Sequence, residues 1–458
     1  MGIVSSLKSF NESTVVGTKD GRRLSLMSLF VPLLIENVLM NLMSTVNTLM
    51  LGHYADDAVA ACGAAGQLVG FLYTFYSVVS GGASVVISHK LGASEENRAS
   101  DAVFTAFFFE GALSLLCGII LTCFARPLMT MMQLSGETLE MAVTYFRIVI
   151  GFSFLQGILS VISATLRSYG LAKKTFVINI FMNVANVVLN YIVLYGPVPV
   201  GLVGVKGIAL ANTCARFMAL LLGIYFLSTS GLNLRFREKN IKTLRNIGSI
   251  LRIGIPSGAS SLSYSLSQVV STSILAVLGT TALTAKIYVS SIVFYVYVVG
   301  YSLGLATAVL IGWMKGAGLV DKAYEVNQKI LRFAVSLNVI LSFIIYLLHV
   351  PLMGLFTSST EIIEMTSTIF LIDIAVEFGR AFNHVENNSL NGAGDVVFPM
   401  IVSIVSAWCM SILFSYILGI KCGLGLEGCW IAFAMDEIFR GMLFFHRFRS
   451  KKWIKAVI

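Results

Sequence analysis

One helix-length segment of the chain carries four polar side chains on a single face. Asp373, Glu377, Arg380 and His384 stand at positions i, i+4, i+7 and i+11, which an α-helix aligns into one stripe. Carboxylates and an imidazole in such a stripe can bind a cation or exchange protons. Glu377 and Arg380, one turn apart, can also neutralise each other. Two interpretations stay open: a salt-bridged stripe that joins helices, or a stripe that faces a cavity.

A second acid stands alone in an apolar segment. Glu36 follows Pro32 by one turn, and the same helical face carries Met40, Met43 and Asn47. A carboxyl group in the hydrocarbon core of a membrane is costly and needs a role. Glu36 is therefore a candidate for proton or cation binding. The alternative is a protonated side chain that hydrogen-bonds to a neighbouring helix.

A third stripe consists of four amides, Asn179, Asn183, Asn186 and Asn190, again at i, i+4, i+7 and i+11. Such a face can line a wet cavity or join helices by hydrogen bonds. We expect it near Glu36, with Glu36 and Asn183 as candidate sodium ligands. The expected coupling-ion candidates, for H⁺ or Na⁺, are Glu36, Asn47, Asn183, Asn186, Asn190, Glu377 and His384. The expected cavity residues are Met40, Met43, Tyr264, Gln268, Asp373 and Arg380.

Composition determines where these stripes lie. The chain of 458 residues is 57% hydrophobic and 12% charged, whereas soluble domains carry about 25% charged residues. Residues 58–88 and 253–285 contain no charged side chain, and each run exceeds the roughly 20 residues that span a bilayer. The sequence therefore predicts an integral membrane protein.

Charges, prolines and glycines divide the chain into twelve predicted transmembrane helices. These are residues 25–51, 58–88, 101–125, 138–165, 174–196, 206–230, 250–278, 283–313, 328–350, 362–389, 397–420 and 427–447. The predicted fold is all-α, with two six-helix bundles. The predicted segments are an N-terminal tail (1–24), a first bundle (25–230), a basic linker (231–249), a second bundle (250–447) and a C-terminal tail (448–458).

Lysine and arginine predict the orientation, because positive residues favour the cytoplasmic side. The basic connections contain Lys8, Lys19, Arg22, Arg23, Lys90, Arg98, Arg167, Lys173, Lys174, Arg235, Arg237, Lys239, Lys242, Arg245, Arg252, Lys315, Lys322, Lys329, Arg332, Arg447, Arg449, Lys451, Lys452 and Lys455. The opposite connections hold only Arg126, Lys206, Lys286 and Lys421. Both termini and the linker are therefore expected in the cytoplasm of an inner-membrane protein. The net charge of +9 is explained by this topology and by lipid contact, not by nucleic acid.

The two bundles look like copies of one unit. A single shift along the chain places Pro32 on Pro256, and the same shift pairs Gly92 with Gly316. An even number of spans per copy predicts a pseudo-two-fold axis along the membrane normal, with a cavity between the copies.

Enzyme and ATP-site motifs are absent from the sequence. It contains neither H-E-x-x-H nor G-x-x-x-x-G-K-[ST], so we expect no zinc hydrolase, no Walker-type pump and no cofactor. With an ATP site excluded and acids inside the membrane, an ion-coupled or uncoupled carrier remains.

Several motifs together resemble the multidrug and toxic compound extrusion (MATE) family, whose superfamily includes lipid-linked sugar flippases. They are Pro32-x-x-x-Glu36, Asn47-Thr48-Leu-Met-Leu-Gly52, Lys90-Leu-Gly92-Ala93, Leu166-Arg-Ser-Tyr-Gly170, Gly254-Ile-Pro256-Ser-Gly258, Leu390-Asn-Gly-Ala-Gly394-Asp395 and Gly425-Leu-Glu-Gly428. The resemblance implies two six-helix bundles, a V-shaped central cavity and alternating access. It also implies export of organic, often cationic, compounds against a proton or sodium gradient.

The chain departs from the family pattern at three positions. Asn47 stands where members usually carry the aspartate tied to coupling, and Tyr264 and Arg380 stand where some members carry acids. Glu36 and Glu377 are candidates to take over the carboxylate role; otherwise coupling differs from that of better-known members, or is weak.

The expected function is a secondary antiporter that exports amphipathic, cationic organic compounds in exchange for H⁺ or Na⁺. The expected partners are small organic substrates and membrane lipids, and we expect the monomer to act alone. A lipid-intermediate flippase and a selective metabolite transporter are the alternatives. A non-transporting sensor would not need the duplicated helices or the polar stripes.

Overall fold

The computed structural model describes residues 10–17, 23–132, 134–196, 204–232, 234 and 244–456. Most of the predicted linker, including Arg235, Arg237, Lys239 and Lys242, lies outside the described residues, as do Lys8, Lys19 and Arg22. The chain forms two compact units. The N-terminal unit comprises Val31–Leu91 and Glu95–Ile255, and the C-terminal unit comprises Met1–Phe30, Gly92–Ser94 and Pro256–Ile458.

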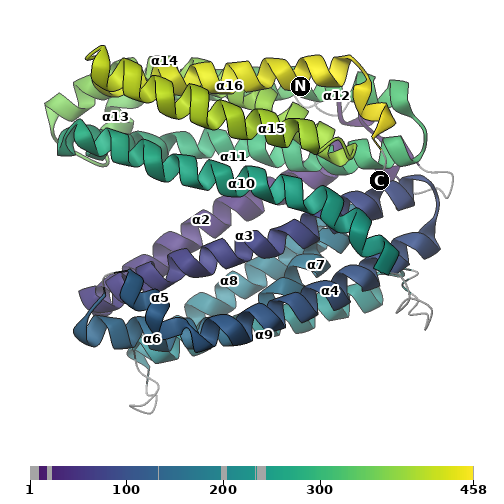
Figure 1. The fold of residues 1–458 in the computed structure, drawn as a ribbon, viewed down its shortest axis with the longest axis horizontal. Coiled ribbons are helices and arrows are strands. Elements are labelled where there is room, and N and C mark those ends of the chain that lie inside the picture. Colours follow the sequence, from purple (N-terminus) through teal and green to yellow (C-terminus); the bar gives the residue numbers. More distant parts are fainter. Residues whose placement is uncertain are drawn as a thin grey trace. The chain divides into compact units, whose positions relative to one another are not determined.

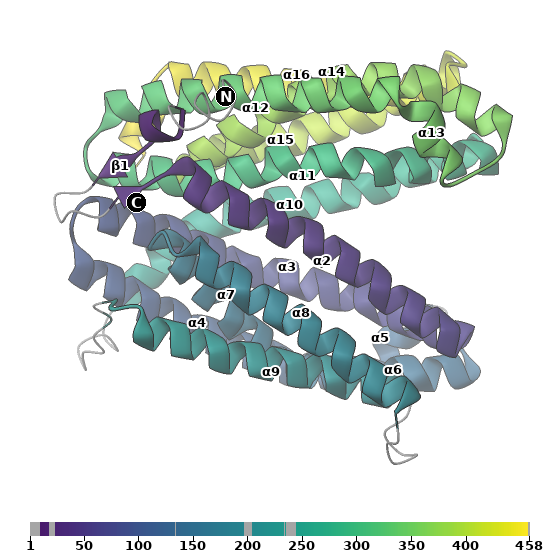
Figure 2. The same ribbon diagram turned by 180° about the vertical axis from the view of Figure 1, so that it is seen from behind.

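The helices of the N-terminal half are α2 (Leu26–Tyr54), α3 (Asp56–Gly92), α4 (Glu96–Cys123), α5 (Ala125–Met131), α6 (Gly136–Gly151), α7 (Phe154–Ser168), α8 (Ala172–Tyr195) and α9 (Val205–Thr229). Within this unit, α8 and α6 pack against α9, and α4 packs against α7 (Figure 2). A buried core that includes Leu72, Tyr76 and Phe146 joins α3 to α6.

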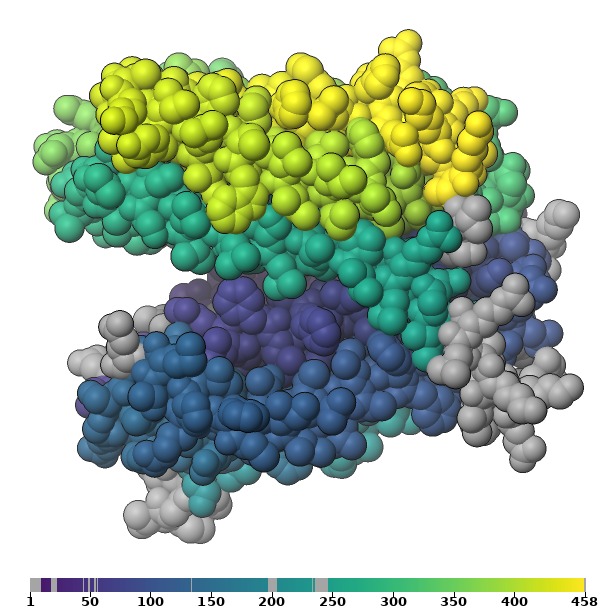
Figure 3. Space-filling view, viewed as in Figure 1, coloured from purple at the N-terminus to yellow at the C-terminus, as the bar shows by residue number. Residues whose placement is uncertain are grey.

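The helices of the C-terminal half are α10 (Leu244–Val277), α11 (Thr280–Gly316), α12 (Val320–Leu347), α13 (His349–Gly354), α14 (Thr360–Gly392), α15 (Val397–Ser406), η3 (Ala407–Ile412), η4 (Ser415–Lys421), α16 (Gly425–Arg449) and η5 (Lys452–Lys455). Helix α14 is central, because α11, α12 and α16 all pack against it (Figure 1). In Figure 3 the side chains of α10 (teal) lie beside those of residues 397–421 (yellow-green), where Trp408 donates a hydrogen bond to Ser263, 3.1 Å away.

The all-α prediction is confirmed, with one small addition. Strands β1 (Val16–Gly17) and β2 (Arg23–Leu24) form a two-residue antiparallel ladder, with Val16 opposite Leu24. Within the described residues this pair is the only sheet.

The described residues account for the twelve predicted spans. Eight helical segments are long and apolar enough to cross a membrane, and the bent pair α6–α7 makes a ninth. The other three long helices, α10, α14 and α16, are less apolar: α10 is rich in serine, and α14 and α16 contain several charged residues. Large apolar side chains such as Phe108 and Ile119 are 60% and 58% exposed, as expected for surfaces that contact lipid.

Two predicted helices are not continuous. The predicted span 138–165 is bent by 47° between α6 and α7. At this bend the Ser153 hydroxyl lies 2.9 Å from that of Tyr76. The predicted span 397–420 changes from α-helix to two π-helical stretches, η3 and η4. Periodicity alone does not reveal either break, because the apolar pattern continues through both.

The internal repeat appears in the ends of the helices. Gly170 and Gly394, which the repeat pairs, have φ of 79° and 81°. The next residue bonds back in the same way in each copy, from Leu171 N to Leu166 O at 2.8 Å and from Asp395 N to Leu390 O at 2.9 Å. This is the Schellman pattern that terminates helices at glycine. The two copies therefore share their helix-ending geometry.

Candidate functional site

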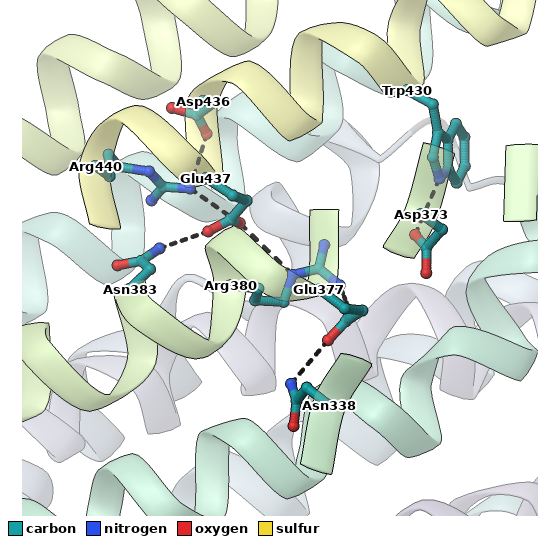
Figure 4. Close-up of polar contacts among 9 residues, drawn as sticks. All are labelled: Asn338, Asp373, Glu377, Arg380, Asn383, Trp430, Asp436, Glu437 and Arg440. Atoms are coloured by element: carbon teal, nitrogen blue, oxygen red, sulfur yellow. Dashed lines mark hydrogen bonds and ion pairs between the residues drawn. The ribbon is translucent and has the colours of Figure 1, made fainter. Parts of the chain in front are cut away.

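A network of charged side chains joins α14 to α16 in the C-terminal unit (Figure 4). Glu377 of α14 is fully buried. It binds Arg380 in the same helix and accepts a hydrogen bond from Asn338 of α12, with 3.0 Å between Nδ2 and Oε2. The Nε of Arg380 lies 3.6 Å from Oε1 of Glu437 on α16. One guanidinium is thus shared by two carboxylates from different helices.

The partner helix adds three charges to this network. Arg440 Nη2 lies 2.7 Å from Asp436 Oδ2 and 3.0 Å from Glu437 Oε1. Asn383 of α14 donates a hydrogen bond to Glu437 Oε2 at 2.6 Å. Every one of these groups is at least mostly buried. The ion pairs between them therefore compensate for the hydration that the charges lose when they are removed from solvent.

Glycine lets the two helices approach closely enough for these contacts. A Cβ atom on Gly379 of α14 would lie 2.6 Å from the backbone nitrogen of Ile438. A Cβ on Gly441 of α16 would lie 2.7 Å from the Cβ of Phe382. Small residues at such crossings are typical of membrane helices. They set the spacing at which Arg380 reaches Glu437.

A cavity of about 320 Å³ opens beside this network. Its wall contains the aromatic side chains Tyr264, Phe294, Tyr297, Trp430 and Phe433, and the charged side chains Asp373, Arg380, Asp436, Glu437 and Lys286. Gln268 also lines it. Four of the six expected cavity residues, Tyr264, Gln268, Asp373 and Arg380, therefore line one cavity.

The carboxylates of this region outnumber its guanidiniums. Glu377, Asp436 and Glu437 share Arg380 and Arg440. Asp373 accepts a hydrogen bond from Trp430 Nε1 at 3.1 Å and makes no ion pair with any described residue. The network has a formal excess of negative charge when all its acids are ionised, and such a site attracts cations.

His384 is placed differently from the cavity residues. Its ring centroid lies 5.0 Å from that of Tyr297 and 5.8 Å from that of Tyr301, with the planes nearly perpendicular. Its Nε2 is buried without a hydrogen-bond partner among the described residues. The imidazole thus lies on the same helix as Glu377, against aromatic rings, and is not part of the cavity wall.

Glu36 is the acid of the N-terminal unit. It is buried, accepts a hydrogen bond from Asn179 Nδ2 at 2.7 Å, and lies 4.0 Å from Arg167 Nη1. Its second oxygen, Oε2, has no hydrogen-bond partner among the described residues. Asn179, the first residue of the amide stripe, therefore joins that stripe to Glu36.

A separate amide cluster lies further along α2 and α8. Asn47 donates to Asn186 at 2.9 Å, and Asn190 donates to Asn47 at 3.2 Å. Asn186 donates to Asn212 of α9 at 2.5 Å, and Asn212 donates to the Tyr145 hydroxyl at 3.4 Å. Asn47, Asn190, Asn212 and Tyr145 line a cavity of about 280 Å³. The cluster is polar but uncharged.

Seven of the expected residues lie outside both cavity walls: Glu36, Met40, Met43, Asn183, Asn186, Glu377 and His384. Asn183 donates its amide to the backbone oxygen of Asn179 at 2.8 Å, within its own helix. Met40 is 47% exposed and Met43 is half-buried, and neither lines the two cavities. A shared helical face thus does not give these side chains a shared environment.

Sequence reasoning missed several residues of both clusters. Glu437 directly follows Asp436 and lies one turn before Arg440, so its charge was the available signal. Lys286 was assigned to a connection, whereas it lies inside α11 and lines the cavity. Asn338, Asn212 and Tyr145 are single polar residues without a recurring spacing, which leaves no pattern to detect. Among the described residues, no group of three His, Cys, Asp or Glu side chains could hold a metal ion.

Long apolar helices with buried charge networks and polar-lined cavities are typical of integral membrane transporters. The sequence model of the MatE family matches residues 32–192 and 256–417, and the chain belongs to that family. The two matches begin at Pro32 and Pro256, which is the register of the internal repeat.

Known proteins support the same assignment along the whole chain. The "Uncharacterized transporter YisQ" of Bacillus subtilis is 34% identical, over 97% of this chain and 98% of that protein. The "Probable multidrug resistance protein NorM" of Thermotoga maritima is 26% identical, over 95% of this chain and 94% of that protein. A crystal structure of a MATE protein in the straight conformation has a TM-score of 0.86 and 20% identity, and covers 94% of this chain and 96% of its own.

Proposed function

We propose that this MatE transporter is an antiporter that exports amphipathic, cationic organic compounds in exchange for H⁺ or Na⁺ by alternating access. Relatives named as multidrug resistance proteins support efflux. The observation that carries the proposal is the aromatic cavity of the C-terminal unit, whose adjoining carboxylates outnumber its guanidiniums. Aromatic rings and carboxylates together suit organic cations.

Coupling requires that the ion and the substrate prefer different access states. We assign the ion to Glu36 in the N-terminal unit and to Glu377 in the C-terminal unit. Both carboxylates are buried. Glu377 forms an ion pair with Arg380, and Glu36 lies near Arg167. Protonation would weaken each contact and thereby favour a different packing of the helices. For Na⁺, Glu36 Oε2 offers an oxygen without a hydrogen-bond partner among the described residues.

The proposed location is the inner membrane, with both termini in the cytoplasm and the monomer as the working unit. The asymmetry of lysine and arginine between the two sets of connections supports this orientation. The lipid-intermediate flippase is less favoured, because a pyrophosphate group requires a cationic cavity. Here both guanidiniums near the cavity are bound to carboxylates.

The proposal is tested with purified protein in liposomes. A pH gradient and a sodium gradient are imposed separately, and uptake of a fluorescent aromatic cation such as ethidium is followed. Uptake driven by one gradient and abolished by the matching ionophore supports antiport. Ethidium that moves under neither gradient, alongside gradient-independent flipping of a lipid pyrophosphate, would support the flippase instead.

A further inference from the structure

The cavity of the C-terminal unit contains a lysine that forms no ion pair with any described carboxylate. Lys286 lies on α11, lines the cavity, and donates from Nζ to the Thr272 hydroxyl of α10 at 2.5 Å. It makes no ion pair with a described residue, although Asp373 lines the same cavity. The Thr272 hydroxyl accepts a hydrogen bond from one of the three N–H groups of the ammonium, but it is neutral and does not balance the positive charge. Lys286 is therefore free to bind an anion.

The same wall contains a carboxylate that makes no ion pair with any described residue. Asp373 is buried and, among the described residues, is hydrogen-bonded only to the indole of Trp430, 3.1 Å away. The nearby Arg380 is already shared between Glu377 and Glu437, and Arg440 between Glu437 and Asp436. One uncommitted ammonium and one uncommitted carboxylate thus face a single cavity.

The remaining wall limits what fits between these charges. Tyr264, Phe294, Tyr297 and Trp430 supply aromatic surface, and about 320 Å³ is near the lower end of the range for sites that hold small organic molecules. A single lysine binds a carboxylate as a point charge, whereas phosphate groups usually meet an arginine fork or several donors.

We propose that this cavity binds aromatic zwitterions, with the ligand's cationic nitrogen at Asp373 and its carboxylate at Lys286. The inference rests on the proposed export function and replaces a simple cation by a zwitterion as the favoured substrate. A zwitterionic ligand neutralises the charges of both Asp373 and Lys286. A simple cation neutralises only Asp373, and its positive charge is repelled by the unpaired Lys286. The competing explanation is that Lys286 only extends its ammonium toward the membrane surface.

Two dyes of nearly the same shape separate these explanations. One is a rhodamine that carries a free benzoate and is zwitterionic, and the other is its methyl ester, which is a cation. Binding of each dye to the purified full-length protein in lipid nanodiscs is measured by fluorescence anisotropy. The compared proteins are wild type, Lys286→Met, Lys286→Arg, Asp373→Asn and Lys421→Met. Lys421 is a matched control, because it is exposed and does not line the cavity.

The wild type is expected to bind the zwitterion more tightly than the ester. Lys286→Met should reduce this preference about tenfold, as expected for loss of one partly buried ion pair. Lys286→Arg should retain most of the preference for the zwitterion. Asp373→Asn should weaken the binding of both dyes. Lys421→Met should bind both dyes as the wild type does. An unchanged preference in Lys286→Met, or a wild type that prefers the ester, would overturn the inference.

Failure of the inference is distinguishable from failure of the proposed function. If ion gradients drive ester uptake in liposomes while Lys286→Met leaves the dye preference unchanged, efflux stands and the zwitterion site does not. If neither dye is transported under either gradient, the export function fails. The binding preference in nanodiscs then still decides whether the site exists.

Discussion

Arg380 of α14 binds Glu377 of its own helix and lies 3.6 Å from Glu437 of α16. This sharing makes the charge balance of the network asymmetric, with three carboxylates for two guanidiniums when Asp436 and Arg440 are included. Removal of an acid restores the balance, whereas removal of an arginine worsens it.

The asymmetry predicts unequal costs for two substitutions. Arg380→Gln leaves Glu377 without a cation and should lower the free energy of unfolding by about 3–5 kcal/mol. Glu377→Gln leaves two carboxylates for two guanidiniums and keeps an acceptor for Asn338. It should therefore lower the free energy of unfolding by only about 1–2 kcal/mol. Denaturant unfolding in detergent, followed by tryptophan fluorescence, compares the two. Equal costs would show that charge balance does not govern the network.

The amide cluster of the N-terminal unit predicts a contrast between two neighbouring asparagines. Asn186→Ala removes a donor to Asn212 and an acceptor for Asn47, and should cost about 1–3 kcal/mol. Asn183→Ala is the control, since among the described residues its amide bonds only to the backbone of its own helix, and it should cost less than about 0.5 kcal/mol. The same unfolding assay measures both, and a larger cost for Asn183→Ala would contradict the structure.

Close packing of α14 on α16 predicts a third effect. Gly379→Ala places a methyl group 2.6 Å from the nitrogen of Ile438, so the helices must separate, at a cost of about 1–3 kcal/mol. Gly66→Ala in α3 meets no atom within 4 Å and should be neutral or slightly stabilising. Differential scanning fluorimetry of both variants checks this. An equally mild effect of Gly379→Ala would mean that the helices can move apart freely.

The repeat supplies a fourth prediction. Ser94 has a φ of 58° at the position that the repeat pairs with Gly318, whose φ is 73°. A residue with a Cβ atom is strained by roughly 1 kcal/mol in this conformation, so Ser94→Gly should raise the thermal midpoint and Gly318→Ser should lower it. Thermal unfolding of the two reciprocal variants measures the shifts. A lower midpoint for Ser94→Gly would show that its hydroxyl matters more than its backbone strain.

The sequence predicted the helices and their duplication well, because apolar length and helix-ending glycines are local signals. Gly170 and Gly394 illustrate this, since one backbone geometry recurs at both. The bend after Gly151 and the π-helical turns near Trp408 were not predictable, because they depend on contacts with other helices.

The candidate site was predicted only where polar residues recur at helical spacing. The stripe from Asp373 to His384 and the asparagine stripe both gave such a signal. Glu437, Asn338 and Lys286 come from other helices, and their positions depend on how those helices pack. The stripe also did not reveal that His384 lies against tyrosine rings while Asp373 lines the cavity.

In the proposed mechanism, ion-coupled export uses the carboxylates of Glu36 and Glu377. The most direct test is substrate-coupled proton release from liposomes, with and without a sodium gradient, for wild type, Glu36→Gln and Glu377→Gln. Glu110→Gln is the control, because Glu110 of α4 is a buried acid whose carboxyl oxygens have no hydrogen-bond partner among the described residues, and it lies outside both cavity walls.

We expect Glu110→Gln to retain coupled flux and at least one of the other two variants to lose it. Loss in Glu36→Gln places coupling in the N-terminal unit, and loss only in Glu377→Gln places it in the C-terminal unit. Full coupled flux in both variants would contradict the account and make both acids structural.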